Sequence, residues 1–235
     1  MYGKTFNELN TRYRPVARKN FFKIFNEKNY SLYKLHFKKN EFFKINNSNF
    51  FIFNCNEITF SNELKKHKSE LIKSSKPLVF KTIGSSFCYI IFQNKSELKI
   101  NKVRRFSSNQ KISYKKVIKL KKYWGEIITL FSNNKGAAKI INMNKGTQSS
   151  MEFHIKKIES YYISKGLIKL GIRFGRAKQK LINLKKYDCF LMKPGTMHMR
   201  MANKESQIIE LSNKDSDNDS IIVHDGLNFK FKEIN

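Results

Sequence analysis

The sequence predicts an all-β protein, and three observations carry that prediction. Short runs of aromatic and β-branched residues, the types enriched in strands, recur about every ten residues along the chain. No apolar stripe of helical period persists beyond the stretch at 62–73. The chain has 235 residues, 40% of them hydrophobic and 14% aromatic, which is enough for a packed core and excludes a wholly disordered chain. Many short strands at this spacing are typical of a β-sandwich or a barrel.

The expected strands are four- to eight-residue apolar runs bounded by polar or turn-forming residues. One short helix is expected at Glu63 to Lys73, where the apolar residues follow a helical spacing. The strands are expected around residues 50–53, 77–80, 88–92, 117–118, 127–130, 139–141, 161–163, 189–192 and 208–211.

Composition divides the chain into four parts. Residues 1–19 form a basic N-terminal arm, which we expect to be mobile, and residues 20–103 form a β-rich domain. The polar and basic segment 104–116 reads as a linker. Residues 117–235 form a second β domain, which contains the residues with evident chemistry.

The formal net charge of +29 first suggests a nucleic-acid or anionic-membrane partner. Residues 1–150 contain 31 basic and 8 acidic side chains (+23), whereas residues 151–235 contain 16 and 10 (+6). The basic residues are mostly Lys, beside many Asn, Ile, Phe and Tyr residues, a bias that an AT-rich genome produces. The basic blocks are also short. We therefore expect solvated lysines rather than a nucleic-acid surface.

The sequence also bears on membrane insertion, secretion and disulfide bonding. No apolar run reaches the ~20 residues that span a bilayer, and the segment MYGKTFNELN lacks the apolar region of a secretory signal, so a cytoplasmic protein is expected. Cys55, Cys88 and Cys189 stand singly, without a CxxC pair. They indicate small core residues rather than disulfides or a thiolate zinc site.

Four side chains in the second domain form a candidate metal site. Glu152 and His154 are two apart, so on a strand they share a face. Lys156-Lys157 must then form a turn, after which Glu159 lies on the inward face of the next strand. His198 follows a Pro-Gly turn some forty residues later, which can direct it towards the first three. Two histidines and two carboxylates suit a divalent transition metal.

The motif frames around these residues resemble those of the cupins, β-proteins of the jelly-roll class that hold one metal inside a barrel. Within that superfamily, residues 117–225 resemble the branch related to type II mannose-6-phosphate isomerases. The resemblance lies in the order and spacing of Trp124-Gly-Glu, Lys139-Ile-Ile, Ser149-x-x-Glu-x-His-x-x-Lys-x-Glu, Ile208-Ile-Glu-Leu, and Asp217 with Asp219. Tyr123 replaces the usual Pro before Trp-Gly.

The resemblance implies a cupin double-stranded β-helix in the C-terminal half, with a divalent metal ion (Zn, Mn, Fe, Co or Ni). His154, Glu159 and His198 fall on family ligand positions, and Glu152 falls where the family has Gln or His. A glutamate there can still bind through oxygen. If it turns away, two histidines and one carboxylate remain, the set used by non-haem iron oxygenases.

The activity implied by the resemblance is aldose–ketose isomerisation of a sugar or sugar phosphate in polysaccharide precursor metabolism. The metal would bind adjacent substrate oxygens while a carboxylate, Glu152 or Glu210, moves the proton. Lys157, Arg173 and Arg200 are the candidate substrate-binding residues. A homodimer is expected. The alternatives are a non-catalytic small-ligand-binding cupin, a non-haem metal dioxygenase-type cupin and, after these, nucleic-acid binding.

The first β domain has the size and rhythm of a second, degenerate cupin. His36 and His67 have no Glu partner in a cupin motif frame. We therefore expect residues 20–103 to be a structural, metal-free domain, with an unrelated β domain as the alternative.

Overall fold

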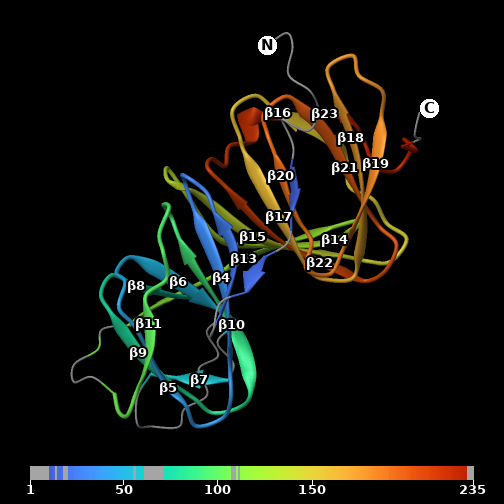
Figure 1. Cartoon of the computed structure of the whole chain (residues 1–235). Coiled ribbons are helices and arrows are strands. Elements are labelled where there is room, and N and C mark those ends of the chain that lie inside the picture. Colours follow the sequence, from blue (N-terminus) through green and yellow to red (C-terminus); the bar gives the residue numbers. More distant parts are fainter. Residues whose placement is uncertain are drawn as a thin grey trace. The chain divides into compact units, whose positions relative to one another are not determined.

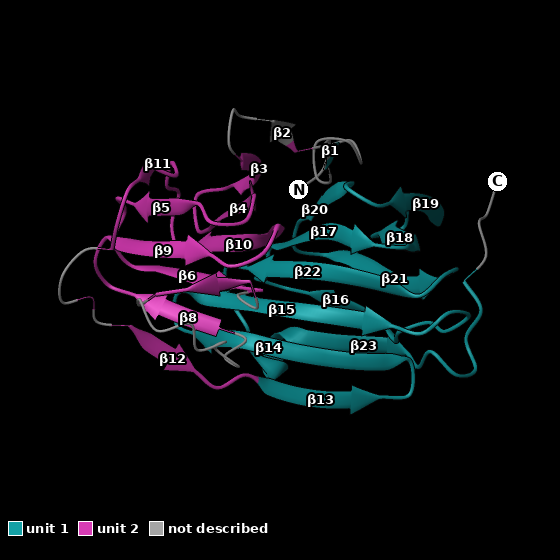
Figure 2. Cartoon of the chain, turned by 90° about the horizontal axis from the view of Figure 1, so that it is seen from below, with its two compact units in different colours: residues 1–14, 118–235 teal, residues 15–117 magenta. Residues whose placement is uncertain are grey.

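The protein is described from a computed structural model of the whole chain. The structure describes residues 11–13, 15–17, 21–54, 57–60, 71–106, 110 and 112–231. Apart from the short 3₁₀ turn η1 (Asp217–Asp219), every regular element in this part of the chain is a β-strand (Figure 1), so the all-β prediction is confirmed. The chain divides into two compact units: unit 1, residues 1–14 and 118–235, and unit 2, residues 15–117 (Figure 2).

Unit 1 consists of two antiparallel sheets. The seven-stranded sheet has the order β1-β20-β17-β22-β15-β14-β13 and the five-stranded sheet has the order β19-β18-β21-β16-β23. The strands of the first are β1 (Thr11–Tyr13), β20 (Cys189–Met192), β17 (Glu159–Lys165), β22 (Ser206–Ser212), β15 (Gly136–Met143), β14 (Gly125–Asn133) and β13 (Ile118–Lys122). Those of the second are β19 (Lys180–Lys185), β18 (Leu167–Phe174), β21 (Thr196–Ala202), β16 (Met151–His154) and β23 (Ser220–His224).

Unit 2 repeats this two-sheet plan. Its seven-stranded sheet has the order β12-β8-β6-β10-β4-β3-β2 and its four-stranded sheet has the order β11-β5-β9-β7. The first contains β12 (Ser113–Lys115), β8 (Leu71–Ser74), β6 (Phe50–Phe53), β10 (Ser86–Phe92), β4 (Ser31–Phe37), β3 (Phe21–Asn26) and β2 (Val16–Ala17). The second contains β11 (Ile100–Val103), β5 (Phe42–Ile45), β9 (Leu78–Thr82) and β7 (Ile58–Thr59).

Each unit has its own core, built from the inward-facing residues of both of its sheets. In unit 2 the core is aromatic: Phe43 and Phe80 stack with their ring centroids 5.6 Å apart, and Tyr33 meets Phe92 edge-on. The unit 1 core is more aliphatic, with Ile163, Leu170 and others packed around Tyr161. Separate cores are what two independently packed sandwiches require.

The expected strands are confirmed, and three expectations about other segments are corrected. The end of the predicted helix is wrong, because residues 71–73 belong to strand β8, which pairs with β6; residues 63–70 lie outside the described part. Within the arm that we expected to be mobile, Thr11–Tyr13 forms β1 and pairs with β20. Within the expected linker, Ser113–Lys115 forms β12 and pairs with β8.

Arg12 on β1 forms an ion pair with Asp188, a buried carboxylate that also accepts a hydrogen bond from the Lys185 amide. Removing one partner from a buried carboxylate is costly, but the amide contact remains. Arg12→Ala should therefore lower the stability of unit 1 by about 1–2 kcal/mol. Urea unfolding followed by the fluorescence of Trp124, the single tryptophan, measures this directly. Arg176→Ala, at an exposed position in the same unit, is the control; equal midpoints for both variants would contradict the prediction.

Two further observations concern the cysteines and the membrane. Cys88 and Cys189 are buried free thiols, and burial raises the pKa of both well above the usual range, which makes them unreactive. Cys55 lies outside the described residues. In the described part of the chain, no helix has the length and apolarity needed to cross a bilayer.

Candidate metal centre

The predicted metal-site residues lie between the two sheets of unit 1. Glu152 and His154 are on β16 and His198 is on β21, all in the five-stranded sheet. Glu159 on β17 and Glu210 on β22 face them from the seven-stranded sheet. Glu152, His154, Glu159 and Glu210 line a cavity of about 510 Å³, a size suited to a small-molecule ligand, and His198 is the cross-strand partner of Glu152.

Local sequence explains how β16 and β21 bring their side chains together. Glu152 and His154 share a face because they are two residues apart, and Glu152 is the direct cross-strand partner of His198. The turn before β21 needs Gly195, whose φ of 82° is in the left-handed region. The Gly195 amide donates a hydrogen bond to the His154 carbonyl (2.7 Å), which fixes this turn against the end of β16.

Both histidines are oriented by backbone carbonyls. His154 Nδ1 lies 2.9 Å from the Asp219 carbonyl oxygen, and His198 Nδ1 lies 3.1 Å from the Thr196 carbonyl oxygen. An Nδ1–H that donates to a carbonyl leaves the lone pair on Nε2. The Nε2 atoms of both rings are buried and have no hydrogen-bond partner among the described residues. Buried ring nitrogens that make no hydrogen bond are expected where a metal ion binds.

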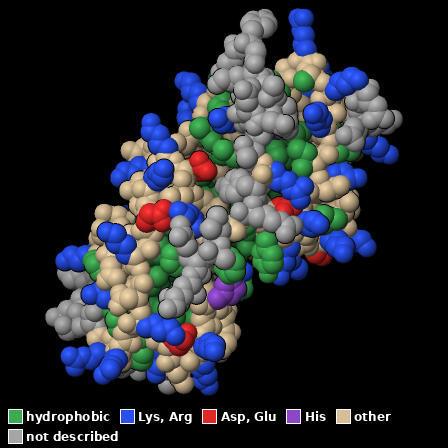
Figure 3. All heavy atoms as spheres, in the orientation of Figure 1, with side chains coloured by type: hydrophobic (Ala, Val, Ile, Leu, Met, Phe, Trp, Pro, Cys, Tyr) green, Lys and Arg blue, Asp and Glu red, His purple; other side chains and the backbone are tan. Residues whose placement is uncertain are grey.

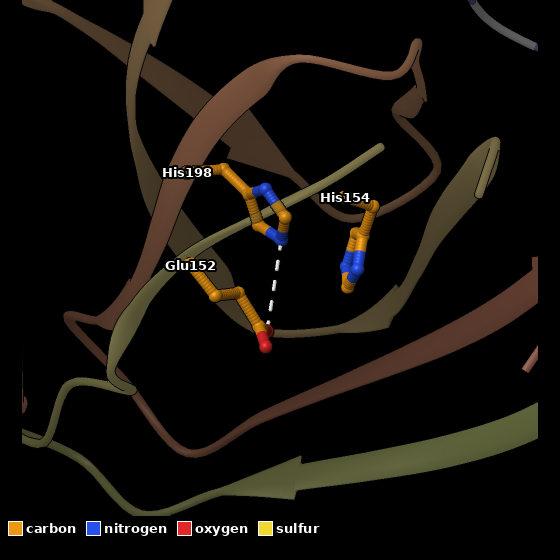
Figure 4. Close-up of side chains that lie close together, drawn as sticks. All are labelled: Glu152, His154 and His198. Carbon is orange, nitrogen blue, oxygen red and sulfur yellow. Dashed lines mark ion pairs between the residues drawn. The ribbon is translucent and has the colours of Figure 1, made fainter. Parts of the chain in front are cut away.

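Glu152, His154 and His198 form the group that can hold the metal (Figure 4). Their ligand atoms all lie within 4.8 Å of one another, and the Glu152 carboxylate lies 3.7 Å from His198 Nε2. Burial alone would raise the pKa of Glu152, but His198 and Arg200 hold that pKa far below its usual range, so the carboxylate is ionised. The set therefore fits a divalent transition metal ion.

Glu159, the fourth predicted ligand, lies beside the same two rings. Its two oxygens are each 3.3 Å from one of the Nε2 atoms, of His154 and of His198. The same oxygens are also paired elsewhere: Lys157 Nζ lies 2.5 Å from Oε1, and the Tyr161 hydroxyl donates to Oε2 at 3.0 Å. Glu159 is thus placed to bind a metal or to orient the histidines that do.

Comparison with known proteins decides the fold. No protein-family model matches the sequence, and no curated protein matches it significantly. Among solved structures, oxalate decarboxylase from Bacillus subtilis at pH 4.6 has a TM-score of 0.66 at 9% identity, covering 94% of this chain and 80% of that chain. The formate complex of Lactobacillus farciminis oxalate decarboxylase has a TM-score of 0.59 at 10% identity, covering 94% and 90%.

The chain has the cupin fold. Since the matches cover 94% of the chain, they extend over both units. A further match, with a TM-score of 0.64 at 10% identity, covers 94% of this chain and 81% of a B. subtilis oxalate decarboxylase that was studied for its Mn(II) centres. Proteins of this fold therefore include ones that carry divalent metal ions, and this chain has a Glu/His/His group that can bind one.

A network of buried charged side chains surrounds the Glu/His/His group. Lys157, 7% exposed, lies between Glu159 and Glu210, with its Nζ 3.0 Å from Glu210 Oε1. Burial would lower the pKa of Lys157, but these two carboxylates raise it above its ordinary value. Arg200 donates to Glu152 Oε1 at 2.8 Å and lies 3.7 Å from Glu210 Oε2. Both cations are therefore charged and bound to carboxylates.

Sequence reasoning did not assign a role to Asp219. Its carboxylate accepts hydrogen bonds from the backbone amides of residues 155, 156 and 157, at 2.8–3.2 Å. Its carbonyl orients His154. Asp219 therefore fixes the turn between β16 and β17, which sets the positions of Lys157 and Glu159. The available signal was the Asp217 and Asp219 pair within the motif resemblance.

Of the candidate substrate-binding and proton-transfer residues, all but Arg173 line the cavity. Lys157 and Arg200 line the cavity, as does Glu210. Arg173, on β18, is not among the lining residues described, and its side chain donates to the Gly175 carbonyl.

In unit 2, no group of metal-binding side chains occurs among the described residues. His36 there packs between Phe22 and Phe87, and its pKa is lowered by burial and by Lys34. Figure 3 shows Lys and Arg scattered over the face in view.

Proposed function

We propose that this cupin is a metal-dependent enzyme that isomerises an aldose to a ketose, with a sugar or sugar phosphate as substrate. The observation that supports it is Glu210, a buried carboxylate in the same cavity as the Glu/His/His group but not part of that group. Such an isomerase needs both a centre that polarises substrate oxygens and a separate proton-transfer group. The motif resemblance to mannose-6-phosphate isomerases supports the substrate class and a role in polysaccharide precursor metabolism.

The metal would be held by Glu152, His154 and His198, with Glu159 as the candidate fourth ligand. When bound, a divalent ion supplies Lewis-acid polarisation of neighbouring carbonyl and hydroxyl oxygens. Glu152 is then occupied as a metal ligand; its Oε1 also accepts from Arg200, and its Oε2 accepts from the Ser220 hydroxyl at 3.0 Å. Of the two predicted bases, this leaves Glu210 as the group that moves the proton.

The cations in the cavity have a double role in this proposal. Lys157 and Arg200 contact Glu210 and hold its carboxylate in place, as a positioned general base requires. Both side chains also have N–H donors that can bind substrate hydroxyl groups. A contribution from Arg173 remains a prediction, as does the homodimer.

Glu210→Gln tests the proposal, because it keeps the size of the side chain and removes the base. With Mn(II)-loaded protein and a panel of aldoses and aldose phosphates, we expect kcat to fall by about 100-fold or more, with metal content unchanged. Glu205→Gln, at an exposed position in the same unit, should keep full activity. If the wild-type protein isomerises no member of the panel, the proposed reaction is wrong, whereas the fold is unaffected.

Dioxygenase-type chemistry is the second candidate, and the ligand set favours it specifically. Glu152, His154 and His198 are two histidines and one carboxylate, the combination found in non-haem iron oxygenases. Iron in the isolated protein together with consumption of oxygen would support this candidate. Zinc or manganese without oxygen consumption would exclude it.

A further inference from the structure

The cavity lined by Glu152 and His154 has both polar and aliphatic lining residues. Ile118 and Leu120 on β13 and Ile222 on β23 line it, with exposed fractions of 69%, 51% and 64%. Exposed aliphatic side chains that line a cavity indicate a ligand with apolar surface, because their burial on binding is favourable. We refer to Ile118, Leu120 and Ile222 as the aliphatic wall.

The two faces of β13 differ, because successive side chains of a strand point to opposite faces. Ile118, Leu120 and Lys122 line the cavity, whereas the alternating lysines, Lys119 and Lys121, do not. The wall also continues into the sheet. Leu120 is the cross-strand partner of Ile127, which in turn pairs with Ile141, and both of these residues line the cavity. Three adjacent strands therefore present one apolar row.

The wall begins directly beside the metal group. Ile222 is the cross-strand partner of Glu152, so their Cβ atoms are expected about 5 Å apart. A ligand bound to the Glu/His/His group would thus contact an aliphatic side chain within its first few atoms.

The polar side of the cavity is already largely neutralised. Of the four cations that line the cavity, Lys139, Lys157 and Arg200 each contact a carboxylate. Such cations attract a phosphate dianion less than unpaired ones would, because their charge is shared. The inner part of the cavity therefore suits neutral chelating oxygens better than a phosphate group.

We infer that the substrate is a sugar derivative with an apolar substituent, such as a deoxy or N-acyl group. Its chelating oxygens face the Glu/His/His group and its apolar part lies against the aliphatic wall. This inference rests on the proposed function, and narrows it from unsubstituted sugars and sugar phosphates to amphipathic sugar derivatives.

The test uses two probes with the same chelating head and different tails, acetohydroxamate and hexanohydroxamate. Binding of Mn(II) to the full chain is first measured by electron paramagnetic resonance, and binding of each probe to the Mn(II)-loaded protein is then measured by calorimetry. We expect hexanohydroxamate to bind at least about tenfold tighter, since burial of two of its four additional methylenes gives that factor.

The wall is then removed by the double variant Leu120→Ser/Ile222→Ser. We expect the affinity ratio of the two probes to fall below about threefold, with Mn(II) affinity unchanged. The matched control is Ile221→Ser: Ile221 is adjacent to Ile222 on β23 but is not a cavity-lining residue, so the ratio should stay at the wild-type value.

The remaining outcomes of this experiment would each contradict one part of the inference. Mn(II) binding with a ratio near one, or a ratio that the double variant leaves unchanged, overturns the wall as a substrate subsite. A double variant that changes the molecular mass measured by light scattering, with the ratio unchanged, shows that the wall is instead covered by a second copy of the chain. Failure to bind Mn(II) overturns the proposed metal-dependent function, and with it this inference.

Discussion

Lys157→Met should lower the free energy of unfolding of unit 1 by about 3–5 kcal/mol. This is the largest stability change that we expect from a single substitution at a buried position. Lys157 is 7% exposed and lies between Glu159 and Glu210, which are themselves buried. Methionine fills the space of the aliphatic stem but leaves two carboxylates without their shared cation. Urea unfolding of the metal-free protein, followed by the fluorescence of Trp124, reports on this unit, because Trp124 is buried in its core.

Two further variants make this result specific. Lys156→Met changes the exposed neighbouring lysine and should alter stability by less than about 0.5 kcal/mol. Adding Glu159→Gln to Lys157→Met should recover part of the loss, since one of the two carboxylates that lost the lysine is then neutral. A loss below about 1 kcal/mol for Lys157→Met would contradict the buried network.

His198→Ala should weaken Mn(II) binding by about 100-fold or more, the largest effect we expect on metal affinity. His198 is 1% exposed, its Nδ1 is held by the Thr196 carbonyl, and its Nε2 makes no hydrogen bond among the described residues but lies 3.3 Å from a Glu159 oxygen. His154→Ala should have an effect of similar size for the same reason. Titration with Mn(II), monitored by electron paramagnetic resonance of the free ion, gives the affinities.

His224→Ala is the control for general effects of removing a histidine. His224 is exposed at the end of β23 in the same unit and stacks on Phe229, 4.3 Å between centroids. Its removal should leave Mn(II) affinity within about twofold of wild type. If His198→Ala and His224→Ala bound Mn(II) equally well, the metal centre would lie elsewhere.

Much of the fold and the centre of the site could be predicted from local pattern. The two-residue spacing of Glu152 and His154 and the Pro-Gly turn before His198 are local properties, and the structure brings these three side chains together. The strands at 88–92 and 161–163 could be predicted equally well, because a run of β-branched and aromatic residues favours a strand over a stretch of only a few residues.

The features that could not be predicted depend on residues far apart in the chain. Asp219 binds the backbone amides of residues 155–157 across more than sixty residues of sequence, and no local pattern specifies that contact. Residues 71–73 have a helical apolar spacing, yet they form a strand because pairing with β6 satisfies their backbone groups. The docking of Thr11–Tyr13 onto β20 is likewise a long-range pairing.

The most direct test of the metal centre is elemental analysis of the full chain, purified without added metal and then reconstituted with one divalent ion. We expect about one tightly held divalent transition metal ion per chain in the wild-type protein and none above background in His198→Ala. A wild-type protein that contains no such ion, and that binds none more tightly than His198→Ala does, would contradict this prediction.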